Sequence, residues 1–153
     1  MGSQDQRLIR EYFDKFEGIL DKSGIIKDRQ ALKKNFAARS ISAGGFSRIG
    51  DPPQGISLIN GGFLSFIELV EVISGKLTRI QYTYRYVSEN QDFVFRYDKD
   101  PRSKGTNYIK NSKGQEEWHP ECHLHYLDSE KPRYKTHETS LDEILEFVKY
   151  CFV

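Results

Sequence analysis

Two stretches, Tyr82-Thr83-Tyr84-Arg85-Tyr86 and Phe93-Val94-Phe95-Arg96-Tyr97-Asp98, decide the fold, because each alternates aromatic rings with other side chains. Alternation with a period of two is the pattern of a β-strand, whose successive side chains point to opposite faces of a sheet. The polar residues between the two stretches suit a turn centred on Glu89-Asn90. The sequence therefore predicts an antiparallel hairpin with every ring of the two stretches on one face.

The same alternation separates the polar side chains of the hairpin from its rings. A slip of the pairing by one residue would destroy this separation, so the register is strongly specified. The face opposite the rings is expected to carry Thr83, Arg85, Arg96 and Asp98. The expected facing pairs are Tyr86 with Phe93, Tyr84 with Phe95, and Tyr82 with Tyr97.

Further strands are predicted upstream of this hairpin. Residues 56–59 are followed by Asn60-Gly61, which predicts a type I′ turn because both central positions of that turn need a positive φ. The return strand is expected at residues 63–73 and the next strand at residues 77–87. A short strand is also expected at residues 46–49.

Helices are predicted at both ends of the chain. Apolar residues recur at helical spacing through residues 3–20, which predicts an amphipathic helix. Near the other end, Ser140 and Glu143 have the spacing of a capping box and are expected to open a final helix. The buried stripe of that helix is expected to be Leu141, Ile144, Leu145, Val148 and Cys151.

The region of residues 25–42 allows two interpretations. Asp28 can cap a short helix that runs through Ala38, with Leu32 and Phe36 on its buried side. An extended segment at Ile25-Ile26 fits the sequence equally well.

The order of these elements predicts an α+β fold, an antiparallel β-sheet flanked by N-terminal and C-terminal helices. The 153 residues fit a single domain, residues 1–153. Within it we expect a helical N-terminal part at 1–42 and antiparallel strands at 44–98. A flexible excursion is expected at 99–117, and a histidine segment with the C-terminal helix at 118–153.

The composition excludes several classes of protein. The net charge of +1 gives no overall field that would attract nucleic acid, so binding of nucleic acid needs a local patch. Two cysteines, Cys122 and Cys151, do not make a disulfide framework, and we therefore expect a cytoplasmic protein. No apolar run approaches the ~20 residues of a membrane-spanning helix, so no membrane association is expected.

The segment Trp118-His119-Pro120-Glu121-Cys122-His123-Leu124-His125 is the strongest candidate for a chemical centre, because it holds three of the four histidines. In an extended segment His123 and His125 point to the same face. Such a pair suits metal ligation, proton transfer or contact with phosphate. Packing at a sheet edge, with hydrogen bonds to backbone, is the alternative without chemistry.

Basic residues gather in the second half of the chain, around the histidines. Arg85 and Arg96 lie in mid-strand opposite the rings, where each needs a partner, either a substrate phosphate or Asp98. Aromatic rings near such arginines can stack on bases. We take Tyr84, Asp98, Arg102 and Arg133 as candidate substrate-binding residues.

Glu68 is a third candidate for chemistry, within the apolar strand at residues 63–73. A carboxylate on a central strand is able to hold a metal ion or act as a base. The alternative is a cross-strand ion pair with Arg79 or Arg85.

The chain resembles the TumE-like toxins of prokaryotic toxin–antitoxin systems over residues 44–150. The resemblance rests on Leu58-Ile59-Asn60-Gly61-Gly62-Phe63-Leu64-Ser65-Phe66-Ile67-Glu68, on Tyr82-Thr83-Tyr84-Arg85-Tyr86, on Phe95-Arg96-Tyr97-Asp98 and on His123-Leu124-His125. It implies a small cytoplasmic toxin that has a cognate antitoxin protein as its partner.

Three hypotheses follow from these residues. In the first, a ribonuclease without a cofactor uses His123 and His125 as general acid and base, while Arg85 and Arg96 hold the phosphate of an RNA substrate. In the second, the chain is a non-catalytic module that binds nucleic acid or protein. In the third, a divalent metal ion held by His123, His125 and Glu68 or Asp98 serves a phosphodiesterase. A homodimer is compatible with each.

Overall fold

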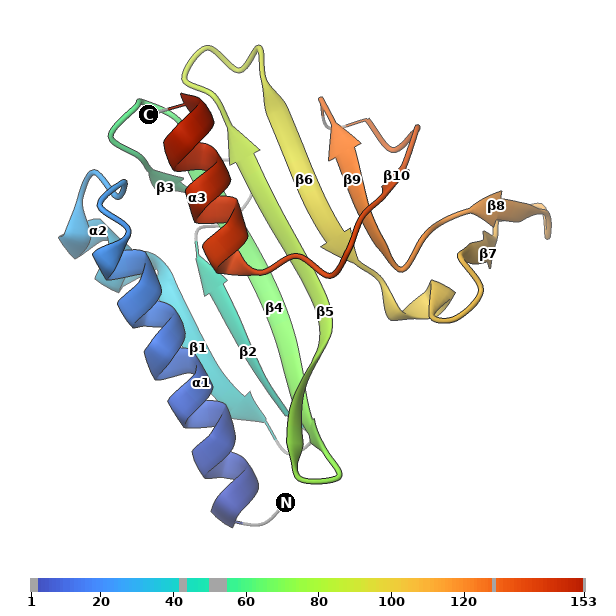
Figure 1. Ribbon diagram of the computed structural model, residues 1–153, viewed down its shortest axis with the longest axis horizontal. Coiled ribbons are helices and arrows are strands. Elements are labelled where there is room, and N and C mark those ends of the chain that lie inside the picture. Colours follow the sequence, from blue (N-terminus) through green and yellow to red (C-terminus); the bar gives the residue numbers. More distant parts are fainter. Residues whose placement is uncertain (1–2, 42–43, 50–54, 128, 153) are drawn as a thin grey trace.

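The computed structural model of the protein describes residues 3–41, 44–49, 55–127 and 129–152 (Figure 1). The helices are α1 (Ser3–Lys22), α2 (Arg29–Asn35) and α3 (Leu141–Phe152), with a short 3-10 helix η1 (Pro101–Ser103). The strands are β1 (Phe36–Ile41), β2 (Gly44–Ile49), β3 (Ile56–Ser57), β4 (Phe63–Ile73), β5 (Lys76–Val87), β6 (Val94–Lys99), β7 (Tyr108–Lys110), β8 (Glu116–Trp118), β9 (Cys122–Tyr126) and β10 (Tyr134–Lys135).

The centre of the fold is one antiparallel sheet with its helices on a single face. Its strand order is β1-β2-β4-β5-β6-β9-β10, and β3 pairs with β4 beside this path. Figure 1 shows α1 and α3 lying across the same side of the sheet. The predicted α+β class, with helices at both ends of the chain, is confirmed. Among the helices of the described residues, none is long and apolar enough to span a membrane.

The aromatic hairpin has the predicted faces but a different register. Tyr82, Tyr84 and Tyr86 are at most 1% exposed, on the face that the helices cover. Tyr86 lies opposite Phe95, however, and Tyr84 opposite Tyr97, two residues away from the expected partners. The cause is a longer loop, because the last pair joins Val87 to Val94 and Ser88–Phe93 form the turn. A shift of two residues keeps every side chain on its face, so the separation of rings from polar groups survives.

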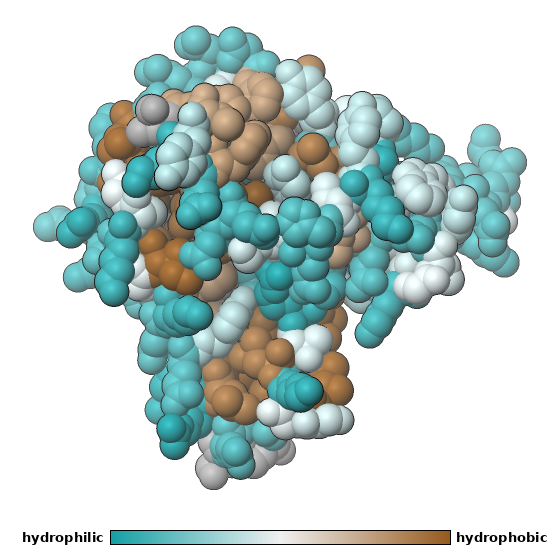
Figure 2. All heavy atoms as spheres, viewed as in Figure 1, coloured by the Kyte–Doolittle hydropathy of each residue, from teal (hydrophilic) through white to brown (hydrophobic). Residues whose placement is uncertain are grey.

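Both terminal helices pack on the aromatic face. Phe16 of α1 meets Phe66 edge-on with ring centroids 5.1 Å apart, and Phe152 of α3 lies 4.9 Å from the ring of Tyr86. The side-chain amide of Asn60 donates to the Tyr86 hydroxyl and to the Phe152 carbonyl, which ties the end of α3 to the sheet. Figure 2 shows a hydrophobic area over the ends of β4 and β5 that α3 does not reach.

The region of residues 25–42 combines both interpretations and adds a strand. Asp28 caps α2 by accepting hydrogen bonds from two backbone amides, and Ile26 forms an extended bridge with Leu58. The helix ends at Asn35, so the expectation that it runs through Ala38 was wrong. Residues 36–41 instead pair with β2, because edge pairing satisfies their backbone groups and outweighs local helical preference.

The turn at Asn60-Gly61 forms a hairpin, but it is not of type I′. Leu58 pairs with Gly62 across a three-residue loop in which Gly61 alone has a positive φ, +81°. The side chain of Asn60 accepts a hydrogen bond from the Gly62 amide and so closes the loop. The positive φ of Gly61 is a backbone conformation that favours glycine.

The stretch 99–117, expected to be a flexible excursion, contains η1 and β7, and β7 pairs with β8 as a second, two-stranded sheet. Its flexibility stays a prediction. The capping box of α3 is confirmed, since the Ser140 amide donates to Glu143 and the Glu143 amide donates to Ser140. Cys151 is exposed and does not belong to the buried stripe of that helix.

The docking of α3 gives a test of this packing. Ile144 is 1% exposed, and truncation to alanine leaves a cavity against the sheet, so Ile144→Ala should lower the free energy of unfolding by about 2–5 kcal/mol. Glu146→Ala, at an exposed position on the same helix, should change it by less than about 0.5 kcal/mol. Urea unfolding followed by circular dichroism measures both, and equal effects would contradict the assignment of the buried face.

Candidate functional site

The candidate site lies on the sheet face that the helices leave free, where β6 and β9 pair. Asp98 is opposite His123 and Arg96 is opposite His125, so these four side chains share one face. The predicted alignment of the two histidines is therefore confirmed. His119 joins them: the ring centroids of His119 and His123 are 4.7 Å apart, and those of His123 and His125 are 4.8 Å apart.

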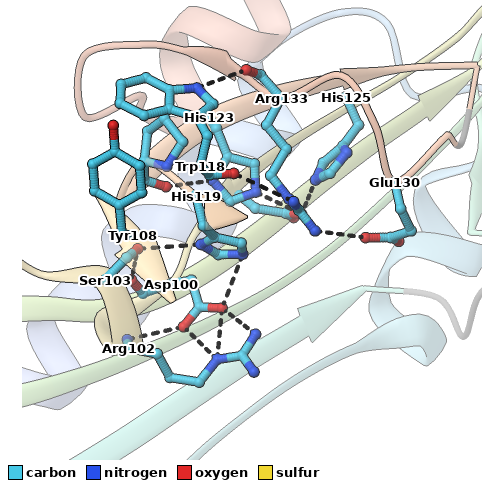
Figure 3. Close-up of polar contacts among 12 residues, drawn as sticks. Asp100, Arg102, Ser103, Tyr108, Trp118, His119, His123, His125, Glu130 and Arg133 are labelled. Atoms are coloured by element: carbon cyan, nitrogen blue, oxygen red, sulfur yellow. Dashed lines mark hydrogen bonds and ion pairs between the residues drawn. The ribbon is translucent and has the colours of Figure 1, made fainter. Parts of the chain in front are cut away.

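The hydrogen bonds of the two histidines fix the direction of their ring nitrogens (Figure 3). Nδ1 of His123 lies 2.6 Å from the Pro120 carbonyl oxygen, and Nδ1 of His125 lies 2.8 Å from that of Ser129. A carbonyl only accepts, so both Nδ1 atoms carry hydrogen and donate. The Nε2 atoms point to the Oδ2 atom of Asp98, at 3.8 Å from His123 and 3.3 Å from His125.

Burial and charge act differently on the members of this cluster. Burial lowers the pKa of His123, so its neutral form is favoured. Burial alone would raise the pKa of Asp98, but the hydrogen bond with His125 and the charge of Arg96 outweigh it, and the net pKa is lowered. At neutral pH an ionised carboxylate therefore faces a neutral imidazole nitrogen.

Two arginines and one glutamate border the cluster. Arg96 donates from Nε to Asp98 at 2.8 Å and from Nη2 to Glu130 at 3.2 Å. Nη2 of Arg133 lies 3.7 Å from the other carboxylate oxygen of Glu130, so Glu130 bridges the two guanidinium groups. Arg85 shares this face, as predicted. It lies opposite Arg96, which the predicted register did not pair with it, and is half-buried.

Two atoms of this region have unmet hydrogen-bonding capacity. Among the described residues, three buried side-chain polar atoms have no hydrogen-bond partner: Asp98 Oδ1, Arg133 Nε and Thr136 Oγ1. Buried polar atoms are normally paired, and exceptions indicate a ligand, an ion or a bound water. An acceptor and a donor of the candidate site are therefore both available to a ligand.

A second row of polar side chains lies beside His119. Its Nδ1 is 3.2 Å from the Ser103 hydroxyl, and its Nε2 is 3.5 Å from a carboxylate oxygen of Asp100. Arg102, a predicted substrate-binding residue, forms an ion pair with Asp100, to which its Nε and Nη2 donate hydrogen bonds. Most of the Arg102 side chain is exposed. Figure 3 shows this row leading from Arg102 to the histidines.

Two predicted site residues lie on the other face of the sheet. Glu68 pairs with Tyr82 across β4 and β5, so strand alternation turns it into the aromatic core, where it accepts hydrogen bonds from the Tyr12 and Tyr84 hydroxyls. Glu68 therefore cannot join His123 and His125 as a metal ligand. Tyr84 is 0% exposed beside it, so the prediction that Tyr84 binds substrate was also wrong.

The loop before β10 forms a pocket next to the cluster. The pocket is lined by Glu117, Trp118, Lys131, Pro132 and Arg133. The Trp118 indole donates to the Arg133 carbonyl, and an Arg133 Nη1 donates to the Trp118 carbonyl. Neither Glu130 nor this pocket could be predicted from a sequence pattern, because both depend on the path of a loop. His119 and Trp118 could have been proposed as site residues from the sequence, because both belong to the histidine segment.

A family model described as toxin TumE matches residues 19–150. The match covers the aromatic hairpin and the Asp98–His123–His125 cluster, and it confirms the resemblance drawn from the hairpin and the His-x-His pair. No curated protein and no solved structure matches the chain.

The buried Glu68 predicts a dependence of stability on pH. Burial raises the pKa of Glu68 above its ordinary 4.5, although the Tyr12 and Tyr84 hydroxyls act in the opposite direction. The stabilisation that this group contributes to the folded state is therefore fully present below pH 4.5. It is lost as the pH rises through the folded-state pKa of Glu68. The free energy of unfolding of the wild type, relative to Glu68→Gln, should fall between acidic and neutral pH.

Denaturant unfolding at a series of pH values measures this difference. Glu146→Gln, on the exposed side of α3, is the matched control and should show no such trend. A difference between wild type and Glu68→Gln that stays constant or grows with pH would contradict the prediction.

Proposed function

The chain belongs to the toxin TumE family, the toxin components of toxin–antitoxin systems, and from this premise we propose that it acts on RNA as a ribonuclease. The centre of the proposed reaction is the Asp98–His123–His125 cluster. Membership of the family implies a cognate antitoxin as partner. The RNA substrate and the chemistry are argued from the site alone.

The bridge between the two arginines is the observation that carries the proposal. Glu130 places a carboxylate between the guanidinium groups of Arg96 and Arg133, beside the histidine cluster. Guanidinium groups bind carboxylate and phosphate through the same planar fork, so the position of this carboxylate marks a site that suits phosphate. The Glu130 side chain is 68% exposed, which makes its displacement by a substrate phosphate inexpensive.

Aromatic side chains next to Arg133 suit the bases of a single strand. Trp118 and Tyr108 are 44% and 46% exposed, and their rings meet edge-on at 5.5 Å. Trp118 is joined to Arg133 by two hydrogen bonds, so a base stacked on the indole would hold its phosphate near the guanidinium group. Stacking of this kind accepts any base and is typical of proteins that bind single strands.

The geometry changes the roles first assigned to the histidines. A general acid and a general base act on opposite sides of a phosphate, whereas here both Nε2 atoms converge on one oxygen of Asp98. Both imidazoles are 1% exposed, and the Asp98 side chain, at 14%, is the part of the cluster that reaches solvent. We therefore assign the reaction to the cluster as a unit, with the substrate approaching from the side of Asp98.

In the proposed reaction the RNA 2′-hydroxyl loses its proton at the cluster, and its oxygen forms a bond to phosphorus. The bond from phosphorus to the 5′ oxygen breaks, and that oxygen takes up a proton. The products are a 2′,3′-cyclic phosphate and a 5′-hydroxyl. Arg96 and Arg133 stabilise the charge that develops on the phosphoryl oxygens.

Cleavage of a labelled single-stranded RNA by the purified protein tests the proposal. His125→Gln should reduce the cleavage rate by at least about 100-fold, the usual contribution of a group that transfers protons or charge. His137→Gln is the matched control, because His137 is exposed and pairs only with Glu143 among the contacts described. The same oligonucleotide with 2′-deoxyribose should resist cleavage. An unchanged rate in a folded His125→Gln variant would refute the role of the cluster.

The aromatic pair gives a separate prediction about binding. Trp118→Ala should weaken the binding of a single-stranded RNA by about 1–3 kcal/mol, the usual value for one stacked base. Tyr150→Ala controls for loss of an exposed ring, since Tyr150 is 82% exposed on α3, on the other side of the sheet. Fluorescence anisotropy at one fixed salt concentration measures both affinities. Equal affinities for the two variants would exclude Trp118 as a stacking platform.

A further inference from the structure

We infer that Asp98, His123 and His125 bind one divalent first-row transition-metal ion, with Zn²⁺ as the reference ion. Each residue offers one ligand atom, and these atoms all lie within 4.8 Å of one another. The binding of the ion is independent of the proposed function, whereas the chemical role given to the ion below rests on it.

The direction of the ring nitrogens is the first argument. Nδ1 of His123 lies against the Pro120 carbonyl and Nδ1 of His125 against the Ser129 carbonyl, so Nε2 is the ring nitrogen with which each histidine can bind a metal ion. Both Nε2 atoms face Oδ2 of Asp98. Imidazole nitrogen and carboxylate oxygen are both ordinary ligands of zinc, so the three residues present their ligand atoms to one place.

The distances between the ligand atoms are the second argument. Two atoms that bind one zinc ion at about 2.0–2.2 Å in a tetrahedral arrangement lie about 3.4 Å apart. The Asp98 Oδ2 atom is 3.3 Å from Nε2 of His125 and 3.8 Å from Nε2 of His123. These two separations are close to those that a shared ion requires. The two Nε2 atoms lie within 4.8 Å of each other, and side-chain adjustment would bring them to the same range.

The surroundings of the three ligands are the third argument. Histidines that bind metal usually donate their other N–H to a backbone carbonyl or a carboxylate, and both histidines here do so. Arg96 holds the carboxylate through its Nε at 2.8 Å. The second carboxylate oxygen, Asp98 Oδ1, is buried without a partner and is free to turn toward an ion.

The donor set narrows the choice of ion. Calcium and magnesium prefer sites built from oxygen, whereas two imidazoles and one carboxylate suit zinc, manganese, iron, cobalt or nickel. Three protein ligands leave a coordination position for water, which is the arrangement of catalytic rather than structural zinc sites.

The ion would supply the proton transfer that the buried histidines cannot supply directly. A metal ion lowers the pKa of its bound water to about 7, so a bound hydroxide would be available near neutral pH. A bound hydroxide would take the proton of the RNA 2′-hydroxyl and become water. The departing 5′ oxygen, on the opposite side of the phosphate, would take its proton from solvent, and loss of a proton from the bound water would restore the hydroxide.

Calorimetric titration of Zn²⁺ into the chelator-treated, dialysed protein tests the inference without any RNA. We expect one saturable site per chain and a rise in the unfolding temperature when Zn²⁺ is present. Asp98→Asn and His125→Gln should each weaken binding by more than about 100-fold, because loss of an outer-shell partner alone costs about 10–100-fold. His137→Gln should bind as the wild type does.

Cobalt provides a direct view of the ligands in the same variants. Co²⁺ in a site of two imidazoles and one carboxylate gives visible absorption bands that should appear with the wild type and be absent with Asp98→Asn. Circular dichroism establishes that each variant is folded. Failure of the folded wild type to bind Zn²⁺ or Co²⁺, or equal binding by Asp98→Asn, would overturn the inference.

The inference and the proposed function fail in different ways. Saturable binding of Zn²⁺ without cleavage of any RNA would support the metal site and refute the ribonuclease. Cleavage of RNA by a protein that binds neither ion, at full rate in the presence of a chelator, would support the ribonuclease and refute the metal site.

Discussion

Because β5, β6 and β9 pair in one antiparallel sheet, each of these strands places alternate side chains on the two faces of the sheet. One face places Tyr84 and Tyr86 in the aromatic core, and the other places Asp98 and the two site histidines in one cluster. A slip by one residue would bring imidazoles into the core and expose rings to water. The packing energy of the rings therefore also fixes the geometry of the candidate site.

The two faces treat a buried carboxyl group in opposite ways. On the aromatic side, the partners of Glu68 are mainly neutral tyrosine hydroxyls, and burial prevails, so its pKa is raised. On the other side, His125 and Arg96 outweigh the burial of Asp98, and its pKa is lowered. The contrast explains why Asp98, and not Glu68, is suited to be an ionised ligand. Sequence alone offered both residues, because it shows a carboxyl group but not its neighbours.

Features that follow from the alternation of side chains along a strand, or from helix capping, could be predicted from the sequence. Features that depend on the conformation of a loop could not. The ring face, the shared face of His123 and His125, and the capped α3 follow from local patterns, and the structure has all of them. The two-residue shift of the hairpin follows from the conformation of Ser88–Phe93, and the bridge formed by Glu130 follows from the path of the chain before β10. Neither feature produces a periodic pattern in the sequence, because the residues of a loop do not alternate regularly between faces.

The division between strands and loop also bears on how the site would work. The candidate ligands sit on paired strands, whose hydrogen-bonded backbone holds side chains to the tolerance that a metal centre needs. The groups suited to phosphate and base, Glu130, Arg133 and Trp118, come from irregular segments or a short edge strand. Glu130 lies between the two arginines, so the phosphate of the proposed substrate would have to displace it. Binding of substrate would thus rearrange the loop while the buried cluster keeps its geometry.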